Sequence, residues 1–171
     1  MQHQTHKPRA GFSLLELIVT AAMMATLVTA VSMVLRSSQN AWEAFDGDHS
    51  RLEAAHATLR HLVRHLRQAE QVVAISSASD SSGTISALLP SGDTVVWDHS
   101  GTSVNYGVSV ATSLLAENID ELTFVGYKAD GVTATTTASD IQLVQCIVKV
   151  TLPRQANTTR TYSNWAWIRA W

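Results

Sequence analysis

The apolar segment from Gly11 to Leu35, GFSLLELIVTAAMMATLVTAVSMVL, constrains the fold more than any other part of the chain. About 20 apolar residues in a helix cover a hydrocarbon core of roughly 30 Å, so this segment is long enough to span a bilayer. One acid, Glu16, lies near its start. A carboxylate within such a segment costs roughly 2.5 kcal/mol or more at the helix centre. We therefore expect Glu16 to have a partner of opposite charge.

A short basic leader, MQHQTHKPRAG, precedes the apolar segment and contains Lys7, Arg9 and no acid. Basic residues before a span keep that end in the cytoplasm, so the rest of the chain should lie outside. An ordinary secretory signal has its small-residue cleavage site after the apolar stretch. The sequence around Val31-Ser32-Met33 offers no such site, and the small residue that stands out is Gly11, before the stretch.

The GFSLLE sequence resembles the prepilin signal of type IV pilins and type II secretion pseudopilins. That signal has a basic leader, a glycine, an aromatic or aliphatic first mature residue, a glutamate at the fifth mature position and an apolar helix. The resemblance implies that a prepilin peptidase cleaves after Gly11 and that Phe12 becomes the N-methylated mature terminus. It also implies that Glu16 pairs with the terminal amine of a neighbouring subunit.

Two opposite charges buried together offset part of each other's desolvation, so such a pair would set the register of assembly more than its stability. The alternative is an uncleaved signal anchor, in which Glu16 reaches back to the cytoplasmic headgroups.

The segment after the span has the pattern of an amphipathic helix. Apolar residues recur at steps of three and four, which places them on one helical stripe; they are Leu52, Ala55, Leu59, Leu62, Leu66, Ala69 and Val73. No proline interrupts residues 12 to 73, so nothing forces a break, and Asp46-Gly47-Asp48 is the one candidate hinge. We expect the stripe to pack on a sheet of the same chain or on neighbouring helices.

Residues 84 to 171 have the composition of short β-strands divided by Gly, Ser and Asp turns. The expected strands are Thr84–Leu89, Asp93–Asp98, Ser103–Val108, Glu121–Tyr127, Ile141–Leu152 and Arg160–Arg169. Segments 76–83 and 128–140 are rich in small polar residues and are expected to be loops, and Asn157-Thr158-Thr159 is expected to be a hairpin turn. The lone cysteine, Cys146, cannot form an internal disulfide and should be a buried strand residue.

These patterns predict an α+β, pilin-like fold, in which a long N-terminal helix packs on a C-terminal antiparallel β-sheet. The first half of the helix would be transmembrane and the second half amphipathic. We divide the chain into a leader (residues 1–11), a transmembrane or filament-core helix (residues 12–35), an amphipathic helical spine (residues 36–75) and an extracytoplasmic sheet domain (residues 76–171).

Two groups of polar residues are candidates for metal sites. His61 and His65 lie four apart on the predicted helix, but HLVRH lacks the glutamate of a zinc-protease motif. Glu117, Asp120 and Glu121 match no calcium loop. We interpret the histidines as solvated residues of the polar helix face, and the acids as a solvated turn with a helix-capping role. Asp46 and Asp48 have the same solvated interpretation. No metal or cofactor is predicted.

Aromatic residues mark two further places. Trp165 and Trp167 occupy alternate positions of the last predicted strand and so face the same side. We expect them to be core residues against the helix; if they are exposed, they are candidates for contact with a partner. Trp42 and Phe45 fit an interfacial aromatic belt or packing along the spine.

The sequence argues against catalysis and against nucleic-acid binding. It contains no glycine-rich phosphate loop, no GxSxG elbow and no Cys-His nucleophile pair at credible spacing. Loss of the leader would remove Lys7 and Arg9 and change the formal charge from −2 to −4. No basic field for nucleic acid would remain.

Two more stretches carry a resemblance to a subfamily. LLAENIDELTFVGY (residues 114–127) and RHLVRHLRQAEQV are similar to segments of J-type minor pseudopilins and W-type minor pilins. The resemblance implies a minor pseudopilin at the tip of a type II secretion-type filament. Its partners would be a prepilin peptidase, other pseudopilins or minor pilins, the inner-membrane assembly platform and the lipid bilayer.

The chain would cross the inner membrane once, with its C-terminal domain in the periplasm, before it enters the filament. One rival is a minor pilin of a type IV pilus or DNA-uptake system. The other is a binding or enzymatic domain on an uncleaved anchor.

Overall fold

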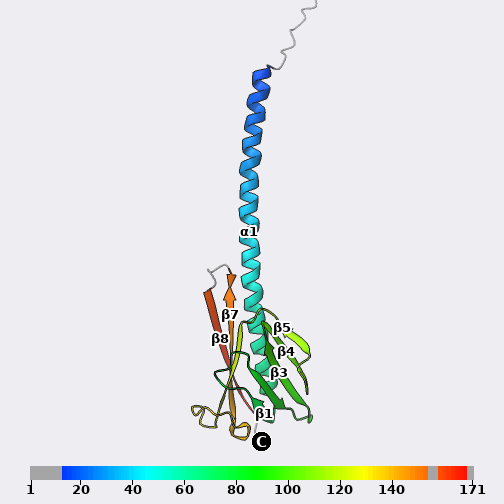
Figure 1. Cartoon of the computed structure of the whole chain (residues 1–171), viewed down its shortest axis with the longest axis vertical. Coiled ribbons are helices and arrows are strands. Elements are labelled where there is room, and N and C mark those ends of the chain that lie inside the picture. Colours follow the sequence, from blue (N-terminus) through cyan, green and yellow to red (C-terminus); the bar gives the residue numbers. More distant parts are fainter. Residues whose placement is uncertain (1–12, 154–157, 169–171) are drawn as a thin grey trace, which may run out of the picture. The chain divides into compact units, whose positions relative to one another are not determined.

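The computed structural model describes residues 13–153 and 158–168, so the predicted leader, Gly11 and Phe12 lie outside the described residues. One long helix is followed by two antiparallel sheets, which confirms the expected α+β, pilin-like architecture (Figure 1). The chain divides into two compact units, an N-terminal unit of residues 1–43 and a C-terminal unit of residues 44–171.

The helix α1 runs from Leu14 to Leu66. It contains no proline and remains helical through Asp46-Gly47-Asp48, so the candidate hinge is not a break. One glycine within a helix costs only about 1 kcal/mol relative to alanine, which is too little to end a long helix.

The helix ends earlier than its apolar stripe predicts. Beyond Leu66 the backbone tightens, because the amide of Ala69 donates to the Leu66 carbonyl at 3.2 Å, and the Glu70 amide then bonds to Leu88. Gln71–Ile75 form the strand β1, in which Val72 is buried and Val73 is 45% exposed. The prediction of helix to Val73 is therefore wrong. The sequence QVVAI contains β-branched residues that favour a strand, and pairing with the next strand prevails over the helical spacing.

The first sheet has the order β1-β2-β3-β4-β5 and the second has the order β6-β7-β8. The remaining strands are β2 (Thr84–Leu88), β3 (Thr94–Ser100), β4 (Ser103–Val108), β5 (Ser113–Ala116), β6 (Glu121–Tyr127), β7 (Leu143–Leu152) and β8 (Thr158–Trp167). The strands β4 and β6 have the ends that the sequence predicts. The prediction missed β1, which it assigned to the helix, and β5, whose four residues are too few to show an alternation.

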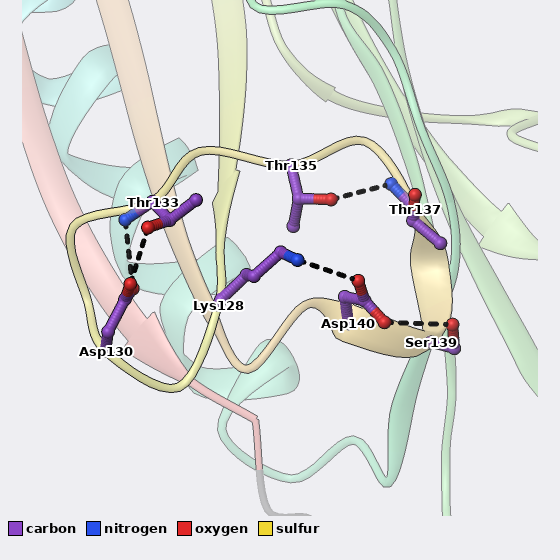
Figure 2. Close-up of polar contacts among 7 residues, drawn as sticks. All are labelled: Lys128, Asp130, Thr133, Thr135, Thr137, Ser139 and Asp140. Atoms are coloured by element: carbon purple, nitrogen blue, oxygen red, sulfur yellow. Dashed lines mark hydrogen bonds and ion pairs between the residues drawn. The ribbon is translucent and has the colours of Figure 1, made fainter.

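The segment after β6 is a loop, as expected, with one short 3-10 turn at Ala138–Asp140. Side chains of this loop form hydrogen bonds and an ion pair with other residues of the loop (Figure 2). The Asp130 carboxylate accepts bonds from the Thr133 hydroxyl and from the amides of Val132 and Thr133, and these bonds lower the pKa of Asp130 to about 2. Lys128 pairs with Asp140 at 3.2 Å. Many of the polar side chains of this loop thus bond to other groups of the same loop.

The core of the C-terminal unit joins the second half of α1 to the sheets. Ala55, Leu59, Leu62 and Leu66 are buried in one cluster with alternate residues of β7, so the helix stripe packs on the chain's own sheets as predicted. The β7 residues of that cluster are Val144, Cys146, Val148, Val150 and Leu152. Burial raises the pKa of the Cys146 thiol to about 12, which makes it an inert core residue.

Replacement of Leu62 tests this packing. Leu62 is fully buried, so Leu62→Ala should lower the free energy of unfolding by about 2–5 kcal/mol through lost contacts and a new cavity. Leu114 is 56% exposed, and Leu114→Ala should change it by about 0.5 kcal/mol or less. Urea unfolding of the full chain in detergent, followed by tryptophan fluorescence, measures both. Equal effects of the two variants would contradict the assigned core.

Candidate functional site

The first half of α1 is apolar on every side and is not covered by the rest of its unit. All described residues from Ser13 to Glu43 are exposed, and Leu14 and Leu15 are 78% and 72% exposed. By length and composition, α1 contains a segment long enough and apolar enough to cross a membrane. A helix that is hydrophobic all round is covered by lipid or by other chains.

Hydroxyl side chains in this apolar half are satisfied by the helix itself. Thr20, Thr26, Thr29 and Ser32 each donate to a backbone carbonyl three or four residues earlier, at 2.8–3.0 Å. Such bonds remove the cost of placing a hydroxyl in an apolar environment. Among residues 13–35, Glu16 is then the only ionisable side chain.

Glu16 lies in the first turn of α1. Its amide and that of Leu17 both donate to the Ser13 carbonyl, at 3.0 and 3.2 Å, which fixes the start of the helix. A carboxylate at a helix N-terminus gains about 0.3–1 kcal/mol from the helix dipole. This is less than the roughly 2.5 kcal/mol or more that a charge costs in an apolar span. No side chain among the described residues pairs with the Glu16 carboxylate.

Comparison with known families assigns this region. Residues 6–32 match the family model described as the prokaryotic N-terminal methylation motif. The chain carries a prepilin-type signal. The matched span includes Gly11, Phe12 and Glu16, and with the long N-terminal helix it is consistent with a type IV pilin-like protein. The search of curated proteins and the search of solved structures gave no match.

The signal has consequences for processing and location. A prepilin-type motif implies processing by a prepilin peptidase and assembly of the pilin kind. Together with the one apolar N-terminal helix, it indicates anchoring in a membrane. Proteins of this type are typically structural.

The histidine pair on α1 is not solvated as predicted. The rings of His61 and His65 lie 4.2 Å apart, and β3 and β4 cover them with Trp97 and Tyr106. Trp97 Nε1 donates to His61 Nδ1 at 3.2 Å, so this nitrogen is an acceptor in a neutral ring. Burial, with the nearby charges of His65 and Arg64, lowers the pKa of His61 to about 4. No group of three metal ligands occurs in the described part of the chain.

The acidic residues are also placed differently from the prediction. Glu117, Asp120 and Glu121 lie where β5 gives way to β6, and no α-helix follows that they could cap. Glu121 opens β6 and forms an ion pair with Lys149 of the adjacent strand. Asp48, which we expected to be solvated, is only 8% exposed. The helix-capping interpretation is wrong, because the segment is a connection between strands.

Trp165 and Trp167 are exposed, at 39% and 54%, so the core interpretation is wrong. The alternation of side chains along β8 is the reason, because Ala166 is buried and the Tyr162 ring lies tilted at 4.9 Å from that of His56 of α1. The odd-numbered side chains therefore lie on the opposite face, where the Trp165 ring lies 5.3 Å from that of Tyr127. The sequence did carry a signal for this orientation: Ala166 and Ile168, the aliphatic residues between and after the tryptophans, occupy the alternate, buried positions. Trp42 and Phe45 are exposed as well.

The partly buried side chain of His61 predicts a pH dependence of stability. The pKa of His61 is about 4 in the folded chain against an ordinary 6.5, so between these values the unfolded chain binds a proton that the folded chain does not. Stability should fall as the pH falls through this window. The variant His61→Asn should lose the part of this pH dependence that comes from protonation of His61. The variant His49→Asn, which changes an exposed histidine, should keep that part. Thermal midpoints at about pH 7 and pH 5 measure this fall in stability. The same fall in the unaltered chain and in both variants would contradict a neutral, partly buried His61 ring.

Proposed function

We propose that this chain is a minor pseudopilin of a type II secretion-type filament, which assembles at the filament tip and supports protein export. The observation that carries the proposal is the position of Glu16. It is the single ionisable residue of the exposed apolar segment 13–35, and it lies within residues 6–32, which match the methylation motif. No catalytic step is part of this function.

The proposed route begins with insertion into the inner membrane, with the N-terminus in the cytoplasm and the C-terminal unit in the periplasm. Cleavage after Gly11 then creates an α-amine at Phe12, which is N-methylated. This amine is a positive charge made by proteolysis at the same depth as the Glu16 carboxylates of neighbouring subunits. Pairing of Glu16 with a neighbour's amine would fix the axial register, while the apolar surface of α1 packs in the filament core.

Several partners follow from this route. Prepilin peptidase, other pseudopilins or minor pilins, the inner-membrane assembly platform and the lipid bilayer are the proposed partners, and nucleic acid is not expected. The exposed pair Trp165 and Trp167 is proposed to contact another subunit, because large exposed aromatic side chains often anchor interfaces.

The methylation motif also fits a minor pilin of a type IV pilus or a DNA-uptake system, which is the second candidate. Neighbouring genes separate the two: secretion-system components favour the first, and retraction or uptake components favour the second. An extracytoplasmic binding or enzymatic domain on an uncleaved anchor is the third, and the next experiment addresses it.

Processing is tested by intact mass spectrometry of the chain co-expressed with a prepilin peptidase. We expect the mass of residues 12–171 plus one methyl group. A Gly11→Val variant should retain the leader, because the bulky side chain blocks the cleavage site. An unmodified protein that begins at Met1 beside an active peptidase would contradict the pseudopilin assignment.

The role of Glu16 is tested by a matched pair of variants. Glu16→Ala removes the charge but leaves the cleavage site intact, so we expect normal processing and loss of at least about nine-tenths of incorporation into filaments. Glu43→Ala removes an exposed glutamate after the apolar segment and should incorporate normally. Immunoblots of sheared filaments measure both. Normal incorporation of Glu16→Ala would refute the register role and leave the cleavage result untouched.

A further inference from the structure

The outer edge of β8 is unpaired within the described part of the chain. This strand is the last in the order β6-β7-β8, it is ten residues long, and no described strand pairs with its other side. An exposed edge of this length presents a row of backbone donors and acceptors and acts as a template for another strand.

The contacts of Trp165 show which backbone groups face that edge. The Trp165 amide donates to the Asn164 side chain at 2.8 Å, and its carbonyl accepts from the Arg67 guanidinium at 3.5 Å. Both groups thus point away from β7. Because N–H and C=O groups alternate in direction along an antiparallel strand, those of Thr161 and Ser163 face the open edge too. The opposite phase is seen at Ile168, whose amide bonds to Gln142 across the sheet.

A basic groove lies on the helix side of this edge. Its volume is about 550 Å³, and it is lined by Arg60, Val63, Arg64, Arg67, Gln68 and Asn164. None of the three arginines forms an ion pair within residues 13–153 and 158–168. The bond from Arg67 to Trp165 shows that the groove adjoins the strand edge.

The opposite face of the same edge is apolar at its C-terminal end. Trp165 and Trp167 are exposed there, beside the ring of Tyr127. A strand added to β8 would project alternate side chains to these two faces, one set toward the arginines and the other toward the tryptophans.

We propose that an extended segment of a partner subunit, in which acidic residues alternate with apolar ones, adds to the outer edge of β8. The spacing agrees with this: Arg60 and Arg64 are about 6 Å apart along the helix axis, and alternate residues of a strand are about 6.7 Å apart. Carboxylates at alternate positions would meet the arginines, and the residues between them would cover the tryptophans. The inference deepens the proposed contact between subunits, but it depends only on the C-terminal unit.

The test uses the full chain in an uncharged detergent and a fluorescently labelled ten-residue peptide with alternating glutamate and valine. Fluorescence anisotropy should show saturable binding. A peptide of the same composition with its glutamates and valines in separate blocks, and an alternating peptide with lysine for glutamate, should each bind at least about tenfold more weakly, because only the alternating acidic peptide satisfies both faces. A version N-methylated on alternate amides, in the phase that faces β8, should also lose binding.

Variants locate the site. Arg60→Gln with Arg64→Gln should weaken binding about fivefold, as expected for the loss of two partly exposed ion pairs, whereas Arg36→Gln should leave it unchanged. Ser163→Pro should abolish it, because proline removes an edge-facing donor and is tolerated at a strand edge. An unchanged urea midpoint shows that each variant is folded. If Ser163→Pro lowers that midpoint, the N-methylated peptide on the unaltered chain supplies the same test.

Three results would overturn the proposal: no saturable binding, equal binding of the block or lysine peptide, or binding of a single-stranded DNA oligonucleotide as tight as that of the probe. The last would make the groove a general anion site. The peptide binds the same surface whether or not Gly11 is cleaved. If the peptide does not bind, the result of the processing experiment is unaffected. If the chain is not processed, the proposed binding surface on β8 is unaffected.

Discussion

The uncovered apolar surface of the first half of α1 is the constraint on which the rest of the molecule depends. Between Ser13 and Glu43 the described residues are all exposed, and the hydroxyls are satisfied by the helix itself. Within residues 13–153 and 158–168, nothing covers this surface and no side chain pairs with the Glu16 carboxylate. A surface of this kind is stable in lipid or against other apolar helices, and a charge within it is costly unless it is paired or reaches water. Membrane anchoring and assembly with other subunits are two ways to cover this apolar surface.

The second half of α1, unlike the first, packs against the rest of its own unit. Its stripe is covered by the chain's own sheets, so the same helix continues from a segment that needs partners to one that is already packed. The polar residues of that second half are divided between two uses. His61 and His65 are drawn into an aromatic cluster with Trp97, whereas Arg60 and Arg64 remain on a groove beside the open edge of β8. The core of the C-terminal unit is thus buried within the unit, whereas the outer edge of β8 is available for contact with another chain.

Local signals in the sequence predicted the architecture and the methylation motif, because a cleavage motif and an unbroken apolar helix depend on neighbouring residues alone. Tertiary context accounts for the errors. The spacing of Ala69 and Val73 continues the helical pattern, but pairing of β1 with β2 ends the helix at Leu66. The alternation that placed Trp165 and Trp167 on one face could not show which face, since that depends on the phase set by Ala166 and Tyr162. The partial burial of His61 depends on Trp97 of β3, which is distant in sequence.

The most direct test of the central claim is zero-length carbodiimide coupling in assembled filaments, followed by proteolysis and mass spectrometry of the linked peptides. A carboxylate that lies against an amine forms an amide with it, whereas a carboxylate in water is captured by an added amine such as glycinamide. The account predicts an amide between Glu16 and the mature N-terminal amine of a neighbouring subunit. Capture of Glu16 by glycinamide in intact filaments, with no link to another chain, would contradict it.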